Sequence, residues 1–255
     1  LLHEDAGSNV ATDRTFSFGP VEEEFANAAH VVEGEYDFPR YSSVPMECYS
    51  VIADWRDGPS VEAWANFHGP FTMVPVMAGA LGLSTSQIRL HVPADIGGSF
   101  GIKAGIYAYV VLMALASKHS GTPVRWSEDR IEHLLASSAG ADRVMRFAAA
   151  VTADGTVTAL KADLVDNVGA YMRPPEPSTL YRCYGNITGP YEIGAVEIRA
   201  RAVVTNQLPV GLNRGFGGQQ LYFGLERLMD AVSDATGLDV IEVRRRNLVG
   251  AFPYE

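Results

Sequence analysis

The amino-acid sequence predicts an α+β fold with mixed sheets, hairpins and packed helices, arranged in two lobes. Two pairs of β-rich segments flank turn signals, at Asp57-Gly58-Pro59 and at Asp154-Gly155. Helical segments follow glycine-rich turns elsewhere in the chain. With 255 residues, of which 47% are hydrophobic and 20% charged, the chain can form one large domain or two small ones with a substantial core.

The first 140 residues are predicted to contain both a connector and a lobe. Residues 1–40 are expected to be an N-terminal connector, extended over 1–20 and followed by a short helix (21–29) and a strand (31–36). Residues 41–255 are expected to form the main domain, with a lobe boundary near 140–175. The elements predicted after residue 41 are a hairpin of strands 49–54 and 60–67, helices over 71–83, 106–118 and 128–135, and strands over 88–92 and 124–126. The apolar composition of 106–118 predicts a buried helix.

The second half contains the clearest hairpin. Strands over 143–151 and 156–166 flank Asp154-Gly155, a dipeptide suited to a tight turn. A proline-rich loop over 173–177 and a strand over 195–205 follow. An amphipathic helix is predicted over 219–235, ended by Gly237, and a last helix over 240–247.

Charge and composition exclude several classes of protein. The net charge of −10 argues against nucleic-acid binding, and no apolar run is long enough to span a bilayer. Cys48 and Cys183 are far apart and lack metal-ligand spacing, so they are predicted to be buried free thiols. Free thiols fit a reducing compartment, so the cytoplasm is expected and the periplasm is the alternative. The chain begins at Leu1 without a signal-peptide pattern, and both ends are expected to be cut from a longer chain.

Two glycine-rich segments could bind a ligand. Asn213 to Gln220 combines three glycines with Arg214 and Phe216 before a helix, which suits either a polar or anionic ligand or a plain tight turn. Gly97 to Lys103 has two interpretations. Its N–H groups could approach an anion, with Lys103 or the helix dipole adding positive potential, or its glycines could allow close packing of helix on strand.

Single residues outside these segments are also candidates. His68 lies at a break between a strand and a helix, where a catalytic role and an ordinary surface position are both open. Arg182 lies among aromatic residues, as either a carbonyl or carboxylate clamp or a solvated side chain. The sequence has no His-Glu-x-x-His segment, no G-x-S-x-G elbow and no Walker loop.

Eight short motifs occur in a fixed order along the chain. They are Pro45-Met46-Glu47, Asn66 to Pro70, Gly97 to Lys103, Trp126 to Arg130, Asp166 to Tyr171, Thr205 to Gly218, Glu226 to Asp230 and Arg244 to Leu248. In this order they resemble the large, molybdenum-binding subunit of the xanthine dehydrogenase and aldehyde oxidase family. The resemblance covers the chain after residue 5, and it corresponds to that family's first molybdopterin-binding domain.

The resemblance implies a molybdenum hydroxylase that oxidises an aldehyde or an N-heterocycle with water-derived oxygen. Its cofactor would be a molybdopterin, with the cytosine dinucleotide form as one option, and the metal would be held by the pterin dithiolene. In the family a molybdenum-bound hydroxide attacks the substrate carbon and hydride passes to a sulfido ligand. Electrons then leave through iron–sulfur clusters to FAD, so the implied partners are an iron–sulfur subunit, an FAD subunit and a second molybdopterin-binding half.

The family's site roles transfer to matching positions. The cofactor-binding residues would be Gly98, Phe100, Gly101, Arg214 and Gly215. Arg214 and His68 would be catalytic, and Phe216 and Arg182 would contact the substrate. His68 replaces the usual Gln, although imidazole can also donate a hydrogen bond.

Other departures bear on the substrate and on completeness. Ile102, Ala104 and Asn213 replace a glycine, a substrate-binding glutamate and an aromatic residue, which argues against xanthine as the substrate. The cysteine-containing loop of carbon monoxide dehydrogenases is absent, as is the G-x-G-E segment that supplies the family's glutamate base. The chain should therefore not turn over substrate alone. The alternatives are a non-catalytic scaffold or interaction subunit and, less favoured, a nucleotide-binding module.

Overall fold

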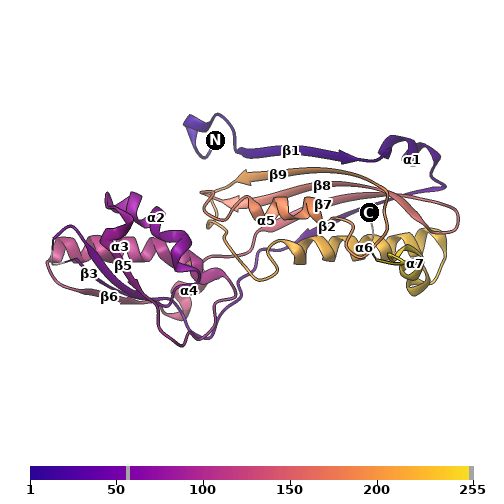
Figure 1. Ribbon diagram of the computed structural model, residues 1–255. Helices are drawn as coiled ribbons and strands as arrows, with labels where there is room; N and C mark the ends of the chain where they lie inside the picture. Colours follow the sequence, from indigo (N-terminus) through magenta and orange to yellow (C-terminus); the bar gives the residue numbers. More distant parts are fainter. Residues whose placement is uncertain (56–57, 253–255) are drawn as a thin grey trace. The chain divides into compact units, whose positions relative to one another are not determined.

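The computed structural model describes residues 1–55 and 58–252, and the chain divides into two compact units (Figure 1). Unit 1 consists of Leu1–Arg40, Ala141–Gln207 and Gly215–Glu255, and unit 2 consists of Tyr41–Gly140 and Leu208–Arg214. Both units combine a mixed sheet with packed helices, so the predicted α+β fold is confirmed. None of the described helices is both long and apolar enough to cross a membrane.

Unit 1 is built on a five-stranded sheet with the order β1-β9-β8-β7-β2. Its strands are β1 (Val10–Phe18), β2 (His30–Phe38), β7 (Asp142–Val151), β8 (Val157–Gly169) and β9 (Ala195–Val204). The β8–β9 pair is parallel and the other pairs are antiparallel. Buried and partly exposed residues alternate along β8 and β9, as expected of strands with one core face.

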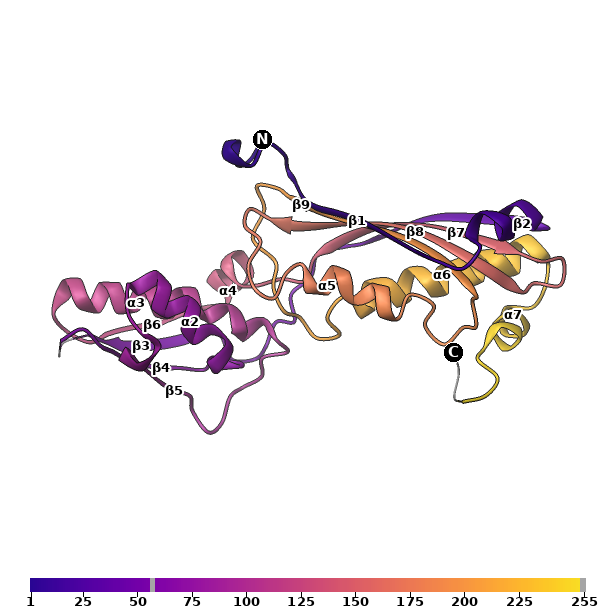
Figure 2. The same cartoon turned by 45° about the horizontal axis from the view of Figure 1, so that its top comes forward.

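Helices of unit 1 pack on this sheet. Figure 2 shows α6 (Gly218–Thr236) running along one face, where it contacts β2 and β7. Its buried residues recur at helical spacing: Leu221, Leu225, Leu228, Met229 and Val232. The unit also contains α1 (Val21–Asn27), α5 (Ser178–Tyr181) and α7 (Val240–Asn247). Gly237 ends α6 in the left-handed conformation, as predicted.

Unit 2 has a four-stranded sheet with the order β5-β4-β3-β6. Its strands are β3 (Ser50–Asp54), β4 (Val61–Ala65), β5 (Ile88–His91) and β6 (Val124–Ser127). The predicted hairpin is confirmed by the antiparallel β3–β4 pair, although Asp57 of its turn lies outside the described residues. Helices α2 (Pro70–Leu81) and α3 (Tyr107–Ser120) cover the same face of this sheet (Figures 1 and 2).

The structure corrects the expected extended connector over residues 1–20. Within it, Val10–Phe18 forms β1 and pairs with β9 at the edge of the unit 1 sheet. Most β1 side chains are exposed, so the strand lacks the hydrophobic alternation that would have predicted it. An ion pair across the two strands, between Arg199 and Asp13 at 2.7 Å, adds to the backbone pairing.

Two predicted helices also differ from the structure. The helix expected to be buried over 106–118 buries only one face, and Leu112 and Leu115 are 55% and 43% exposed. The helix expected from residue 128 is α4 (Arg130–Ala136). It starts later because Asp129 is its N-cap, accepting the Glu132 N–H at 2.8 Å while the Glu132 carboxylate accepts the Asp129 N–H at 2.9 Å.

Candidate functional site

In unit 2, one carboxylate ties the glycine-rich loop to the segment before β3. Glu47 pairs with the Lys103 ammonium, whose side chain is completely buried. The same carboxylate oxygen accepts Asn66 Nδ2–H at 2.8 Å and the Gly97 N–H at 3.1 Å. Because Glu47 neutralises Lys103, the interpretation that this lysine adds positive potential for a ligand is wrong.

The backbone N–H groups of the loop mostly have internal partners. Gly98 N donates to Ile96 O at 2.8 Å, and Ile102 N to Ser99 O at 3.2 Å. The Ser99 hydroxyl accepts from the Gly101 and Lys103 N–H groups at 3.2 and 3.3 Å. These N–H groups are therefore not directed at an anion, and the loop is a tightly closed turn before a 3₁₀ segment over Ile102–Ile106.

Gly101 brings the loop into contact with the segment 208–214 of the same unit. Its φ is +103°, and a Cβ there would lie 2.8 Å from Leu212 Cγ and 3.0 Å from Leu212 O. The neighbouring Asn213 is 3% exposed, and its Oδ1 accepts a hydrogen bond from Ser43. Its Nδ2 is buried and has no hydrogen-bond partner among the described residues. A buried donor without a partner is unusual in a protein and suits a ligand acceptor.

Phe100 and His68 lie at the same loop. Phe100 has a φ of +54° and is 43% exposed, and Gly98 lies beneath its ring. Left-handed conformations are costly for phenylalanine and gather at functional sites. His68 is exposed. Its backbone N–H donates a long hydrogen bond of 3.5 Å to the backbone carbonyl of Lys103, at the end of the loop. Unit 2 thus gathers His68, Phe100 and Gly101 next to the segment that ends in Arg214.

In unit 1, the side chain of Arg143 is the centre of a buried network. Arg143 lies directly opposite Asp166 across β7 and β8, and its Nη2 is 2.8 Å from Asp166 Oδ2. Its Nη1 donates to Cys183 Sγ at 3.0 Å and to Gly217 O at 3.2 Å, and Nη2 donates to Thr179 O at 3.4 Å. One side chain therefore connects the sheet, the segment around Arg182 and the loop around Phe216.

In this network the Arg143 guanidinium is charged and the Cys183 thiol is neutral. Burial alone would lower the pKa of Arg143, but Asp166 more than offsets burial, so the pKa is raised and the guanidinium stays protonated. Burial raises the pKa of the Cys183 thiol, although Arg143 opposes the shift. Cys183 is the buried free thiol that the sequence predicted, whereas Cys48 is only half-buried.

The network positions Phe216 and Arg182 together. Phe216 has a φ of +52°, and the Arg182 guanidinium lies over its ring at 5.6 Å from the centroid. The next residue, Gly217, has a φ of +85°, and a Cβ there would lie 2.1 Å from Thr179 O. The backbone before Arg182 therefore packs directly on the backbone after Phe216, which leaves room for glycine alone.

Glu176, beside this network, was not singled out from the sequence. It lies in the proline-rich loop, its Oε2 accepts a hydrogen bond from Thr179, and its Oε1 is buried without a partner among the described residues. Burial raises its pKa to about 7, with a further contribution from Asp166. The carboxyl group therefore titrates near neutral pH in the loop that precedes Arg182.

Glu176→Gln is expected to stabilise unit 1 above neutral pH. Because the folded-state pKa is above the unfolded value, the stability contributed by protonated Glu176 is complete below about pH 4.3 and is lost as pH rises through about 7. Glutamine cannot ionise, so it avoids this loss. Urea unfolding should show a variant advantage of roughly 1–3 kcal/mol at pH 8 and a much smaller one at pH 5. Equal advantages at both pH values would contradict the assignment.

Glu47→Gln is expected to remove an acid-sensitive contribution to the stability of unit 2. Burial pushes the pKa of Glu47 up, but Lys103, Asn66 and Gly97 outweigh it, so the pKa is lowered. The ion pair thus stabilises the fold above the unfolded pKa of about 4.3, and that contribution is lost as pH falls through the folded value. At pH 7 the variant should lose at least about 1 kcal/mol, because Lys103 stays buried without its partner.

Urea unfolding between pH 3 and pH 7 checks this expectation. The free energy of unfolding should fall more steeply with acid in the wild type than in Glu47→Gln. Glu62→Gln is the matched control, since Glu62 is 43% exposed and pairs with the partly exposed His91 on the same sheet. A Glu47 variant with the wild-type acid slope would rule the contribution out.

The predicted site residues therefore fall into one group in each unit. Unit 2 holds His68, Gly98, Phe100, Gly101 and Arg214, and unit 1 holds Gly215, Phe216 and Arg182. The glycine-rich motif that begins at Asn213 is thus shared, with the boundary between Arg214 and Gly215. Sequence reasoning missed Arg143 and Glu176, which support the second group.

Comparisons with known proteins agree with the motif order. Residues 2–248 match the family model described as the molybdopterin cofactor-binding domain. The nicotine 6-hydroxylase large subunit of Paenarthrobacter nicotinovorans is 35% identical over 96% of this chain and 30% of its own length. The gamma subunit of the 6-hydroxypseudooxynicotine dehydrogenase complex from the same organism is also 35% identical, over 92% of this chain and 30% of its own length.

A solved structure shows the same fold. Quinoline 2-oxidoreductase from Pseudomonas putida 86 matches 96% of this chain and 32% of its own chain, with a TM-score of 0.86 and 31% identity. The chain therefore spans about a third of the length of these relatives. The family model covers nearly all of the chain, and the two glycine-rich loops lie within the match. This chain belongs to the molybdopterin cofactor-binding domain family.

Proposed function

We propose that this chain is the first molybdopterin-binding part of the catalytic subunit of a molybdenum hydroxylase that oxidises an N-heterocycle or an aldehyde. The observation that supports it best is the buried, unpartnered Asn213 amide in unit 2, which lies in sequence between Arg214 and Leu212, the residue in contact with Gly101. Among substrates, N-heterocycles are favoured, because two of the relatives are named for nicotine and quinoline.

The residues of unit 2 fit a large polar cofactor. The unpartnered Asn213 Nδ2, the exposed His68 imidazole and the exposed Arg214 guanidinium provide donors for oxygen and nitrogen acceptors. The ring of Phe100 is 43% exposed and offers an apolar surface beside them. The metal would be carried by the pterin dithiolene, so the cofactor would need no side-chain metal ligand at this loop.

When bound, the cofactor supplies the redox chemistry, and the chain's residues position the reactants. His68 and Arg214 would hold cofactor oxygens by hydrogen bonding and charge. Phe216 would pack against a flat substrate ring. Arg182, whose guanidinium lies over the Phe216 ring, would polarise a substrate carbonyl or ring nitrogen. Ala104 is buried and offers no carboxylate, which disfavours purines as substrates.

The proton-accepting base and the electron carriers would come from other parts of the enzyme. We propose a second molybdopterin-binding half that supplies the glutamate base, and iron–sulfur and FAD-carrying subunits or domains that remove the electrons. The name of one relative, a subunit of a dehydrogenase complex, supports an enzyme with several subunits. The cytosine dinucleotide form of the cofactor remains part of the proposal.

Co-expression of the chain with a polypeptide that carries the missing half tests this function. Molybdenum is measured by mass spectrometry, and oxidation of quinoline, nicotine and benzaldehyde is followed with a dye as electron acceptor. The complex should contain molybdenum and oxidise at least one of the N-heterocycles, and the chain alone should oxidise none of the three. Turnover by the chain alone would contradict the need for a second half, and a stable complex without molybdenum would favour a scaffold.

A further inference from the structure

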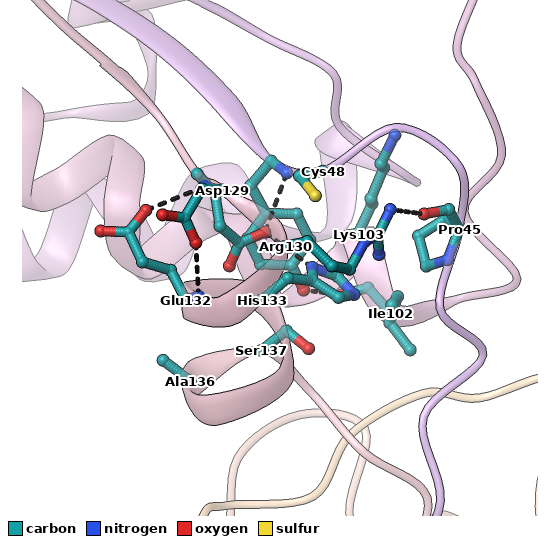
Figure 3. Close-up of polar contacts among 12 residues, drawn as sticks. Pro45, Cys48, Ile102, Lys103, Asp129, Arg130, Glu132, His133, Ala136 and Ser137 are labelled. Atoms are coloured by element: carbon teal, nitrogen blue, oxygen red, sulfur yellow. Dashed lines mark hydrogen bonds and ion pairs between the residues drawn. The ribbon is translucent and has the colours of Figure 1, made fainter.

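Three side chains with metal-binding atoms meet in unit 2, at the start of α4. Cys48 lies just before β3, Glu128 just after β6, and His133 on α4. One potential ligand atom from each lies within 4.8 Å of the others. Figure 3 shows Cys48 and His133 in this region, with Arg130 between α4 and Pro45. Sequence spacing could not reveal the group, because Cys48 and Glu128 are 80 positions apart.

Two of the three side chains are buried and incompletely hydrogen-bonded. The side chains of Glu128 and His133 are 0% exposed, and His133 Nδ1 lies 2.6 Å from Glu128 Oε2. The Tyr49 N–H also donates to Glu128 Oε2, at 3.0 Å. Glu128 Oε1 and His133 Nε2, however, are buried with no hydrogen-bond partner among the described residues. Buried polar atoms of this kind need a water, an ion or a ligand.

We propose that Cys48, Glu128 and His133 bind a divalent ion of the zinc class. Thiolate, carboxylate and imidazole are the ligands that Zn²⁺ takes in proteins, and three protein ligands leave a fourth position for water. The negative charges of a Cys48 thiolate and the Glu128 carboxylate would balance the charge of the ion, so the occupied site is neutral. Cys48 is half-buried, which gives the ion and its water a way in.

The distances fit this ion with a small adjustment. Tetrahedral ligands at bond lengths of 2.0–2.3 Å lie about 3.5 Å apart. Because the present separations are at most 4.8 Å, closing the site needs an approach of up to about 1.3 Å, and His133 and Glu128 are already in contact. Cys48 can make that approach by rotating its side chain, since it is the least buried of the three.

Neighbouring residues hold the ligands in place and do not compete for the ion. The carboxylates of Asp129 and Glu132 are used in the capping box of α4. The Arg130 guanidinium donates from Nη2 to Pro45 O at 2.6 Å and to Met46 O at 3.0 Å, while its Nη1 is buried without a partner among the described residues. This arginine fixes the segment that leads to Cys48 against α4, as outer groups do in known metal sites.

Cobalt substitution tests the site in the 255-residue chain. After treatment with a chelator, the chain is titrated with Co²⁺, and the thiolate-to-cobalt charge-transfer absorption is recorded. We expect one Co²⁺ per chain, tetrahedral cobalt bands, and displacement by Zn²⁺. Cys48→Ser should abolish the thiolate band and weaken Zn²⁺ binding at least about tenfold. Zn²⁺ should also raise the melting temperature of the wild type but not of Cys48→Ser.

Cys183→Ser is the matched control, because it removes the other thiol of the chain, in unit 1, and leaves the three ligands intact. It should keep the charge-transfer band. Cys48→Ser leaves the buried Glu128–His133 contact in place, so we expect the variant to fold, and a loss of metal binding then reports the loss of the ligand. His133→Gln provides a second variant in which a ligand is removed. The proposal is overturned if wild type shows no thiolate band, or if Cys48→Ser binds Zn²⁺ as tightly as wild type.

Discussion

Replacing Arg143 with methionine is expected to lower the free energy of unfolding of unit 1 by about 3–5 kcal/mol. The guanidinium is fully buried and bonded to Asp166, Cys183, Gly217 and Thr179. Methionine can fill much of the volume but makes none of these bonds. Asp166, only 1% exposed, would be left as a buried charge without its partner. That uncompensated charge, more than the lost contacts, sets the size of the effect.

Urea unfolding of the variant measures this cost, and two further variants separate its causes. Arg199→Met breaks an ion pair with Asp13 on the same sheet, where both side chains are more than a third exposed, and should cost less than about 1 kcal/mol. The double variant Arg143→Met/Asp166→Leu removes both charges and should recover a large part of the loss. If Arg143→Met costs no more than Arg199→Met, Arg143 does not hold the network together.

Arg143 also shows how far the sequence could have predicted the site. A simple hairpin centred on Asp154-Gly155 would pair Arg143, 11 residues before Asp154, with Asp166, 11 residues after Gly155. The structure keeps this pairing, although the turn itself pairs Val151 with Val157 and a register shift next to Ala150 restores it. The cross-strand pair could therefore have been inferred. Its other partners could not, because Thr179, Cys183 and Gly217 reach Arg143 through loops whose paths no local pattern determines.

The fold followed local patterns wherever hydrophobic periodicity was strong. The β7–β8 hairpin and α6 agree closely with prediction because each has one apolar face and clear end signals. β1 was missed because an exposed edge strand is stabilised by backbone pairing, which leaves no hydrophobic alternation. Lys103 was misassigned for a related reason: its partner Glu47 is 56 positions away, so sequence showed the charge but not its neutralisation.

Gly217→Ala is expected to destabilise unit 1 by about 3 kcal/mol or more, and to reduce the activity of any assembled enzyme. Alanine at a φ of +85° costs about 1–2 kcal/mol in any surroundings. The new methyl group would also lie 2.1 Å from Thr179 O, which is backbone and cannot rotate away, so overpacking adds a further cost of about 1–3 kcal/mol. Relief of the clash must move the Phe216 loop away from the Arg182 segment.

Gly237→Ala is the matched control for the conformational part of this cost. Gly237 has a φ of +70°, but nothing lies within 4 Å of its added Cβ, so only the strain of the left-handed conformation applies. The reduced flexibility of the unfolded chain offsets some of that strain. Chemical denaturation should therefore place Gly237→Ala within about 1–2 kcal/mol of wild type and Gly217→Ala well below it. Equal losses of unfolding free energy in the two variants would mean that the backbone at Thr179 moves away from the new methyl group at little cost. Gly217 would then be needed only for the left-handed turn, and not for the packing of Arg182 against Phe216.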